Sequence, residues 1–251
     1  MREALRGLII LAVAAASVHT LYVQFIRPRA EILIEAGVAA GQYAPRDWVV
    51  ILKDWEQEIC LILAIYCIVE ILIRLYKLSK EQYLFEVDFV GQVESGETDL
   101  KSTLEDLESL PRSVGKSQLV ETLKASIRRY RITSDVQNTS DAIQTSVDAV
   151  AMRLEADNTM LRYMIWAIPS IGFIGTVRGI GQALSQADQA LAGDISEMTA
   201  SLGIAFNSTF VALVISIFLM LLLHSLQRAQ DRRLVDIQSY CEEFLLNRIS
   251  Q

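Results

Sequence analysis

Residues 202–223 have the sequence LGIAFNSTFVALVISIFLMLLL, and this stretch decides the fold class because it contains no ionisable side chain. A helix needs roughly 20 consecutive apolar residues to cross the hydrocarbon core of a bilayer. Three earlier parts of the chain also approach this length of apolar sequence, at 7–26, 59–73 and 163–180. The sequence therefore predicts an all-α integral membrane protein with four transmembrane helices, the last of them at 201–225.

The composition supports a membrane location. Of the 251 residues, 52% are hydrophobic and 21% are charged, which leaves too few polar side chains to cover a soluble domain of this size. The formal net charge of -7 argues against nucleic-acid binding, because proteins neutralise phosphates with a basic face. Three cysteines and two histidines leave little for a disulfide framework or a metal site. The lipid bilayer is thus an expected partner, and nucleic acid is not.

The sequence does not predict an enzyme. Gly-Lys-Ser at 115–117 matches the end of a phosphate-binding loop, but Leu110 stands where that loop needs its first glycine. No Ser-His-Asp or Cys-His arrangement emerges, since His19 and His224 both lie on apolar runs or at their edges. We expect His19 to be a satisfied polar residue rather than a proton relay.

Positive charge predicts the orientation of the four helices, because Lys and Arg concentrate in cytoplasmic loops. Basic residues cluster around the end of the second helix at Arg74, Lys77 and Lys80, whereas 181–201 contains neither Lys nor Arg. Four basic residues lie in the first outer loop, contrary to this rule, but the cytoplasmic regions still contain more basic residues. The four are Arg27, Arg29, Arg46 and Lys53. We therefore expect both termini in the cytoplasm and this order: transmembrane helix 1–27, outer loop 28–55, transmembrane helix 56–78, cytoplasmic helical region 79–160, transmembrane helix 161–182, outer loop 183–200, transmembrane helix 201–225 and cytoplasmic tail 226–251.

The first apolar run also has features of a secretory signal peptide, because it follows Arg2 and Arg6 and contains small residues at 14–17. The run continues through Ile26, which is longer than the apolar part of a typical signal peptide. We expect this helix to be retained.

The cytoplasmic region has the periodicity of helices. Ile143, Val147, Val150 and Leu154 form an apolar stripe, and no Gly or Pro interrupts the chain between this stripe and the third transmembrane helix. We therefore expect one long helix that leaves the membrane. Two stretches predict turns between shorter helices: Gly91–Gly96 and Pro111–Gly115. Glu70 and Arg74, four residues apart, form a plausible local ion pair.

Each of the last two transmembrane helices has a face of small or hydroxylated residues. In the third helix this face contains Gly172, Gly175, Thr176 and Gly179. In the fourth it contains Ala205, Thr209, Ala212 and Ser216, with Ser208 beside it. Small residues four apart allow two helix backbones to approach closely, so a tight helix contact is one interpretation. The other interpretation is a narrow passage in which threonine hydroxyls bind water or an ion.

Two segments of these helices resemble a known family. IPSIGFIGTVRGI at 168–180 is similar to APLLGLLGTVWGI of the MotA/TolQ/ExbB proton-channel proteins, and STFVALVISI at 208–217 is similar to their ATAIGLFAAI. The resemblance covers roughly residues 145–235, and the first segment is the more specific.

The resemblance implies an A-type subunit of an ion-driven motor in a bacterial inner membrane, which uses the proton or sodium motive force to rotate a B-type partner. Five copies would surround two single-span helices of that partner, each with an intramembrane Asp. Helices three and four of each copy would line the pore. The resemblance implies no cofactor, and H⁺ or Na⁺ would be the transported ion. The residues implied in the ion pathway are Thr176, Thr209, Ser208 and Ser216. Those implied in helix packing and a kink are Pro169, Gly172, Gly175 and Gly179.

The sequence departs from the family pattern at two positions. Arg178 replaces a usually aromatic or apolar residue and would place a charge at the outer mouth of the pore. We expect it to reach the membrane interface or to pair with a partner or with an outer-loop acid, namely Asp188, Asp194 or Glu197. Ile204 replaces a Glu that three-span members often carry, so the last two transmembrane helices contain no carboxylate. This chain alone is therefore not expected to bind and release a proton on a carboxylate, and the resemblance implies that this acid is an Asp on the partner.

Two other classes of protein remain open at this point. The chain could be a non-conducting oligomeric scaffold whose cytoplasmic helices dock a soluble partner. It could also be a subunit of a secondary transporter, although the sequence has neither an evident inverted repeat nor a membrane-embedded binding pair.

Overall fold

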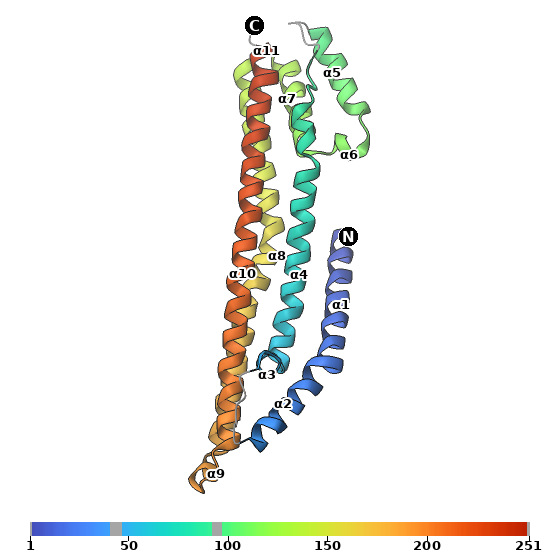
Figure 1. Ribbon diagram of the computed structural model, residues 1–251. Helices are drawn as coiled ribbons and strands as arrows, with labels where there is room; N and C mark the ends of the chain where they lie inside the picture. The colour runs from blue at the N-terminus through green and yellow to red at the C-terminus, as the bar shows by residue number, and fades with distance from the viewer. Residues whose placement is uncertain (1, 41–46, 92–96, 250–251) are drawn as a thin grey trace. The chain divides into compact units, whose positions relative to one another are not determined.

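The computed structural model describes residues 2–40, 47–91 and 97–249, and all secondary structure in these ranges is helical (Figure 1). The four longest helices are α1 (Arg2–Leu21), α4 (Trp55–Lys80), α8 (Val136–Ser185) and α10 (Ser196–Cys241). Within the described ranges, four helical stretches are long and apolar enough to cross a membrane. The predicted helical class and the four candidate transmembrane helices are thus confirmed. Arg46 and residues 92–96 of the predicted turn lie outside the described residues.

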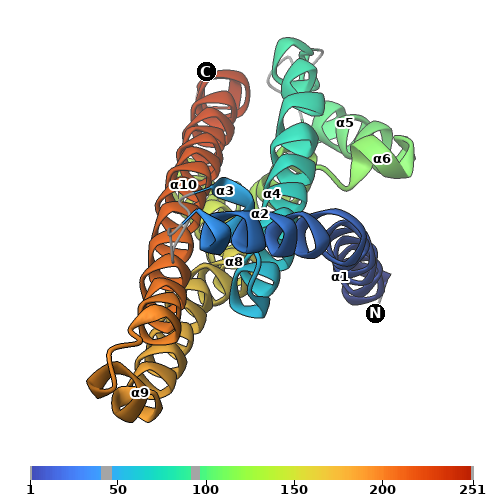
Figure 2. The ribbon, with the colours of Figure 1, turned by 60° about the horizontal axis from the view of Figure 1, so that its bottom comes forward.

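The chain divides into two compact units. Unit 1 comprises Met1–Leu72 and Met160–His224, and unit 2 comprises Ile73–Thr159 and Ser225–Gln251. Helix α8 contributes to both units as one uninterrupted helix, as predicted from its apolar stripe. Helices α8 and α10 run side by side in two views of the ribbon (Figures 1 and 2).

In unit 1, the first helix does not end near residue 27. A π-helical turn (Tyr22–Ile26) leads directly into α2 (Arg27–Ala39), and α3 (Trp48–Ile51) follows before α4. Much of the segment predicted as a loop at 28–55 is therefore helical. The physical reason is an apolar stripe that crosses the predicted boundary, made of Val18, Tyr22, Ile26 and Ala30. This stripe packs against Val49 and Val50 of α3. Pro28 lies just after the π-helical turn, and the helix continues past it.

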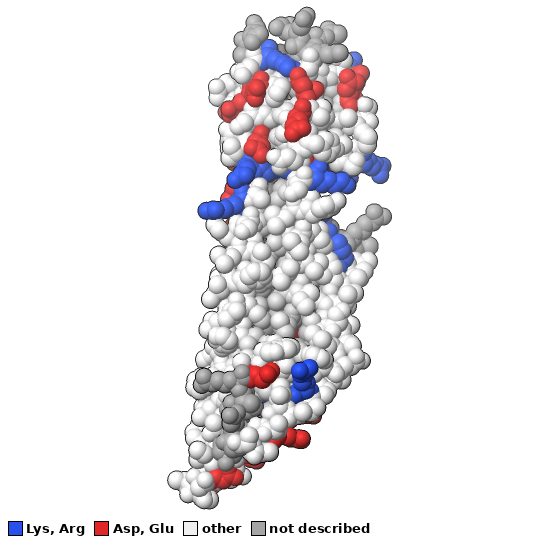
Figure 3. All heavy atoms as spheres, in the orientation of Figure 1, with Lys and Arg blue, Asp and Glu red and all other residues white. Residues whose placement is uncertain are grey.

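The surface of unit 1 is apolar over α8 and α10. Exposed side chains include Phe173, Val177, Phe206, Phe210 and Ile217, each more than half accessible. Figure 3 shows a broad zone almost free of Lys, Arg, Asp and Glu on the face in view. An exposed apolar zone of this kind is typical of a surface that faces lipid or other subunits.

Unit 2 has its own core. Its helices are α5 (Glu97–Ser109), α6 (Arg112–Gly115) and α7 (Gln118–Thr133), together with the ends of α4, α8 and α10, a 3₁₀ turn (Gln82–Glu86), a π-helical turn (Glu242–Leu246) and α11 (Asn247–Ile249). Ile143 and Val147 of the predicted stripe lie in this core with Leu123, Ile127 and Ile237. The Gly-Lys-Ser tripeptide proves to be a helix start, because the Ser117 hydroxyl accepts the backbone N–H of Val120 at 3.4 Å.

In unit 2, the Tyr240 side chain of α10 forms two hydrogen bonds with the backbone of the segment between α4 and α5. The Tyr240 hydroxyl donates to the carbonyl of Val87 at 2.7 Å and accepts the backbone N–H of Phe89 at 2.9 Å. Replacing Tyr240 with Phe is expected to lower the free energy of unfolding by about 1–3 kcal/mol, because both backbone groups lose a partner. Thermal unfolding of the purified protein checks this. Tyr83→Phe is the matched control, since Tyr83 is about half exposed, and an equal loss in both variants would contradict the assignment.

Candidate functional site

The glycine face of α8 lies directly against α10 in unit 1. A Cβ atom added at Gly172 would lie 2.5 Å from the Cβ of Ala212, and one added at Gly179 would lie 2.6 Å from the backbone N of Ala205. At Gly175 it would lie 2.5 Å from the Ser208 hydroxyl. Any side chain larger than hydrogen would therefore force the two helices apart. The small faces of the two helices meet each other, as the first of the two sequence interpretations requires.

Thr176 and Thr209 also meet at this contact. Their hydroxyl oxygens form a hydrogen bond with each other across the two helices. The Thr176 hydroxyl can also donate to the carbonyl of Ala205 at 3.1 Å, and the Thr209 hydroxyl can donate to the carbonyl of Gly172 at 3.2 Å. Both side chains are partly exposed, in contrast to the glycines behind them. Because a hydroxyl has one proton and two lone pairs, the pair retains acceptor capacity for a water or a cation at the surface of the contact.

The two serines lie differently from the threonines. Ser208 is only 1% exposed, donates to the carbonyl of Ile204 at 2.9 Å and accepts from the Gln57 amide of α4 at 3.4 Å. Ser216 is also buried. The structure therefore brings Thr176 and Thr209 together at a partly exposed position, while Ser208 faces α4.

Pro169 lies inside α8, one turn before the glycine face. Its ring removes one hydrogen bond of the helix, the one that would reach the carbonyl of Ile165. The carbonyl of Ile168, the residue before the proline, lies 3.7 Å from the Cys60 thiol of α4. Helix α8 continues through the proline, and α4 contacts α8 at the residue before it.

Arg178 binds carboxylates other than those expected from the sequence. Its Nε lies 2.6 Å from Glu56 Oε1 and its Nη2 lies 2.9 Å from Glu56 Oε2, a bidentate ion pair. Asp54 Oδ1 is 3.5 Å from Nη2, and the guanidinium lies 6.0 Å from the centre of the Trp55 ring. The expected pairing with the outer-loop acids Asp188, Asp194 or Glu197 is wrong. The first turn of α4 brings a buried carboxylate to Arg178 from a distant part of the chain.

A model of the MotA/TolQ/ExbB proton channel family matches residues 115–239, which contain the glycine face and both threonines. The chain belongs to this family. MotA/TolQ/ExbB proteins are channels and not enzymes, and the family assignment implies an ion-channel subunit of a motor complex in a membrane. No curated protein and no solved structure matches the chain.

The acidic start of α4 is a feature of this MotA/TolQ/ExbB chain that the sequence reasoning missed. Glu56 and Gln57 are fully buried and Glu58 is 7% exposed. Burial raises the pKa of the Asp54 carboxyl above its ordinary value, although Lys53 and Arg178 oppose this shift. The available signal was the run Asp-Trp-Glu-Gln-Glu at 54–58, in which three acids precede an apolar stretch. Acids are common in the first turn of a helix, so the run did not by itself predict buried ion pairs.

Two further ion pairs join α1 and its extension to α4. Glu58 accepts from Arg27 Nη2 at 2.6 Å and lies 2.7 Å from His19 Nδ1. Glu70 accepts from Arg6 Nη2 at 3.2 Å. Glu58 therefore neutralises Arg27, one of the four basic residues of the predicted outer loop. His19 has a polar partner, as expected. The predicted pair of Glu70 with Arg74 stays a prediction.

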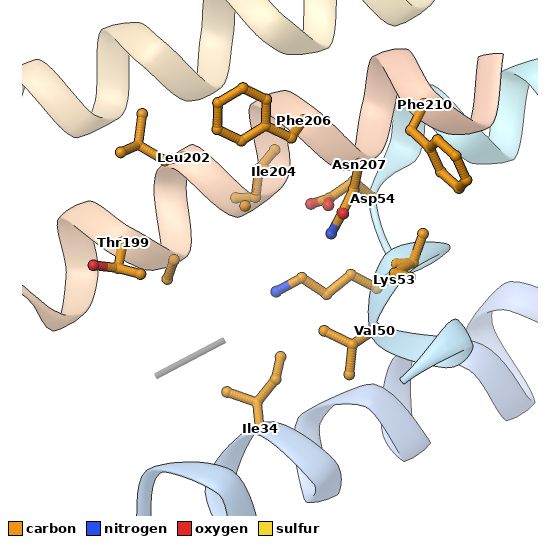
Figure 4. A pocket seen from close by; sticks show the side chains of 13 residues that line it. Ile34, Val50, Lys53, Asp54, Thr199, Leu202, Ile204, Phe206, Asn207 and Phe210 are labelled. Carbon is orange, nitrogen blue, oxygen red and sulfur yellow. The ribbon is translucent and has the colours of Figure 1, made fainter. Parts of the chain in front are cut away.

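A cavity of about 690 Å³ lies between α2, α3 and the start of α10 (Figure 4). Its walls are mainly apolar and include Ile34, Leu202 and Phe206. Lys53 extends into the cavity, and the Asp54 carboxylate lies on its wall near Asn207.

Proposed function

We propose that this protein is the A-type subunit of an ion-conducting motor that converts the proton or sodium motive force into rotation of a B-type partner. The observation that carries the proposal is the Thr176–Thr209 pair, whose hydroxyls meet at a partly exposed position beside the glycine contact. In a ring of copies, this side of each chain would face the central passage. The hydroxyls would then bind water or the ion as it passes.

The acid that carries the proton belongs, in this proposal, to the partner. Ion coupling needs a group whose charge changes inside the membrane, and a buried carboxylate is the usual one. The stretches 161–182 and 201–225 contain no carboxylate. The carboxylates that α4 brings nearby are bound to arginines, Glu56 to Arg178 and Glu58 to Arg27. An Asp on a single-span partner enclosed by five copies would complete the site.

Each cycle would proceed by neutralisation of that Asp from outside and its deprotonation toward the cytoplasm. The neutral side chain could pass the apolar surface of the next copy, where a charged one could not. One elementary charge that crosses 100 mV releases about 2.3 kcal/mol, so successive charges supply the work of rotation. We further propose a bacterial inner-membrane location with both termini and the region 79–160 in the cytoplasm, which is where a rotor or another soluble partner would bind.

The experiment is purification of the chain together with a single-span protein, carrying an intramembrane Asp, that is encoded beside it. We expect a complex of five copies of the chain with two of the partner by native mass measurement. In liposomes with an imposed membrane potential, a pH-sensitive or Na⁺-sensitive dye should report flux that disappears when the partner Asp is replaced by Asn. A stable complex that conducts neither ion would overturn the proposal and would favour the non-conducting scaffold.

A further inference from the structure

The Arg178 guanidinium and the Thr176 hydroxyl lie on nearly opposite sides of α8. Successive residues of an α-helix are rotated by about 100°, so positions 176 and 178 are separated by about 200° around the axis. The contacts agree with this rotation, because Thr176 binds Thr209 and Ala205 of α10 whereas Arg178 binds Glu56 of α4. The permanent cation is thus directed away from the threonine pair.

We infer that Glu56 is a positioning residue for conduction: it neutralises Arg178 and holds its guanidinium on the α4 side of α8, away from the ion passage. This inference rests on the proposed function. Glu56 is fully buried, and both of its oxygens bind the guanidinium in the fork geometry that fixes an arginine in place. The Arg178 side chain is still 28% exposed, so it would be free to move if the carboxylate were lost.

Gly175 provides the space for this carboxylate. A Cβ at Gly175 would lie 3.2 Å from the Cγ of Glu56, which is tighter than ordinary van der Waals contact. The same glycine would contact Ser208 of α10, whose hydroxyl binds Gln57. The first turn of α4 is therefore packed against both helices of the threonine pair, and Glu56 is held in one position relative to them.

The need for such a residue follows from the chemistry of arginine. A guanidinium cannot lose its proton in a protein, so only an opposite charge can cancel its field. An unpaired cation about 10 Å from the path of another cation, at an effective dielectric constant of about 20, lowers its local concentration by about tenfold or more. Asp54, at 3.5 Å from Arg178, assists Glu56 without the bidentate geometry.

The test is Glu56→Gln in the complex with its partner, assayed for flux in liposomes. We expect flux to fall by about tenfold. The double variant Glu56→Gln/Arg178→Gln should restore flux, because neither charge remains. About 1 M of an impermeant salt, N-methylglucamine chloride, should also restore much of the flux of the single variant, since the screening length falls to about 3 Å. Glu31→Gln is the control, because it removes an exposed carboxylate of α2 and should leave flux unchanged.

A second measurement reports the position of Arg178 without any flux. Phenylglyoxal modifies accessible arginines, and mass spectrometry of the complex should show faster modification of Arg178 in Glu56→Gln than in the unchanged protein. Equal modification, or unchanged flux in Glu56→Gln, would overturn the inference. A flux loss that neither the double variant nor salt reverses would also overturn it, because the role would then be structural. A complex without any flux overturns the proposed function and the conduction role of Glu56 together, while the modification rates still show whether Glu56 holds Arg178.

Discussion

Replacing Gly179 with alanine is expected to destabilise the packing of α8 on α10 by about 3 kcal/mol, the upper end of the cost of overpacking. The added Cβ would lie 2.6 Å from the backbone N of Ala205 and 2.7 Å from the carbonyl of Ser201. Backbone atoms of a helix cannot rotate out of the way as a flexible side chain can, so the helices themselves must separate. Thermal unfolding of the purified protein, or loss of its assembled form on a sizing column, checks the prediction.

The matched controls are Gly181→Ala in α8 and Gly203→Ala in α10. Apart from the adjoining backbone of the same helix, no heavy atom of the described residues lies within 4 Å of a Cβ placed at either position. Alanine is favoured over glycine inside a helix by about 1 kcal/mol, so these variants should be as stable as the unchanged protein or slightly more so. Equal stability of all three variants would show that the close approach of α8 and α10 does not hold in solution.

The contact at Gly179 was accessible from the sequence because it depends on spacing within one helix. Residues three or four apart share a face of any helix, so the three glycines at 172, 175 and 179 predict a close partner wherever that partner lies. The long helix α8 was predictable for the same reason, from the stripe that includes Ile143 and Val147. Local periodicity therefore determined the elements on which the candidate site is built.

The partner of Arg178 was not accessible in this way. Glu56 lies 122 residues earlier in the chain, and the two meet only because α4 packs beside α8. The sequence placed Arg178 at the outer mouth of the pore, which directed the expectation to acids of the following outer loop instead. The extension of the first helix past Arg27 was missed because the prediction followed the continuous apolar run, which ends at Ile26. The buried stripe continues through Ala30 and packs on α3.

Replacing either Thr176 or Thr209 with valine is expected to reduce ion flux by about 10- to 100-fold. A hydrogen bond to a charged group contributes about 1.5–3 kcal/mol, and valine keeps the shape of threonine without its hydroxyl. Assembly of the complex should survive. The carbonyls of Gly172 and Ala205, which accept from these hydroxyls, lie within helices and keep their backbone N–H donors when the hydroxyls are removed. Flux through liposomes that contain the complex is the measurement. Ser170→Ala is the control, since this exposed hydroxyl of α8 bonds only the Trp166 carbonyl of its own helix.

The serine variants at the same two positions separate conduction from packing. Thr→Ser retains the hydroxyl and loses a methyl group, whereas Thr→Val does the reverse. If the hydroxyls hydrate the ion and the partner Asp, the serine variants should conduct at close to the unchanged rate while the valine variants do not. If the side chains only fill the contact between α8 and α10, both valine variants should conduct normally and the serine variants should lose stability. Normal flux and motor output in Thr209→Val would therefore remove the ion pathway from this face and leave only a helix contact.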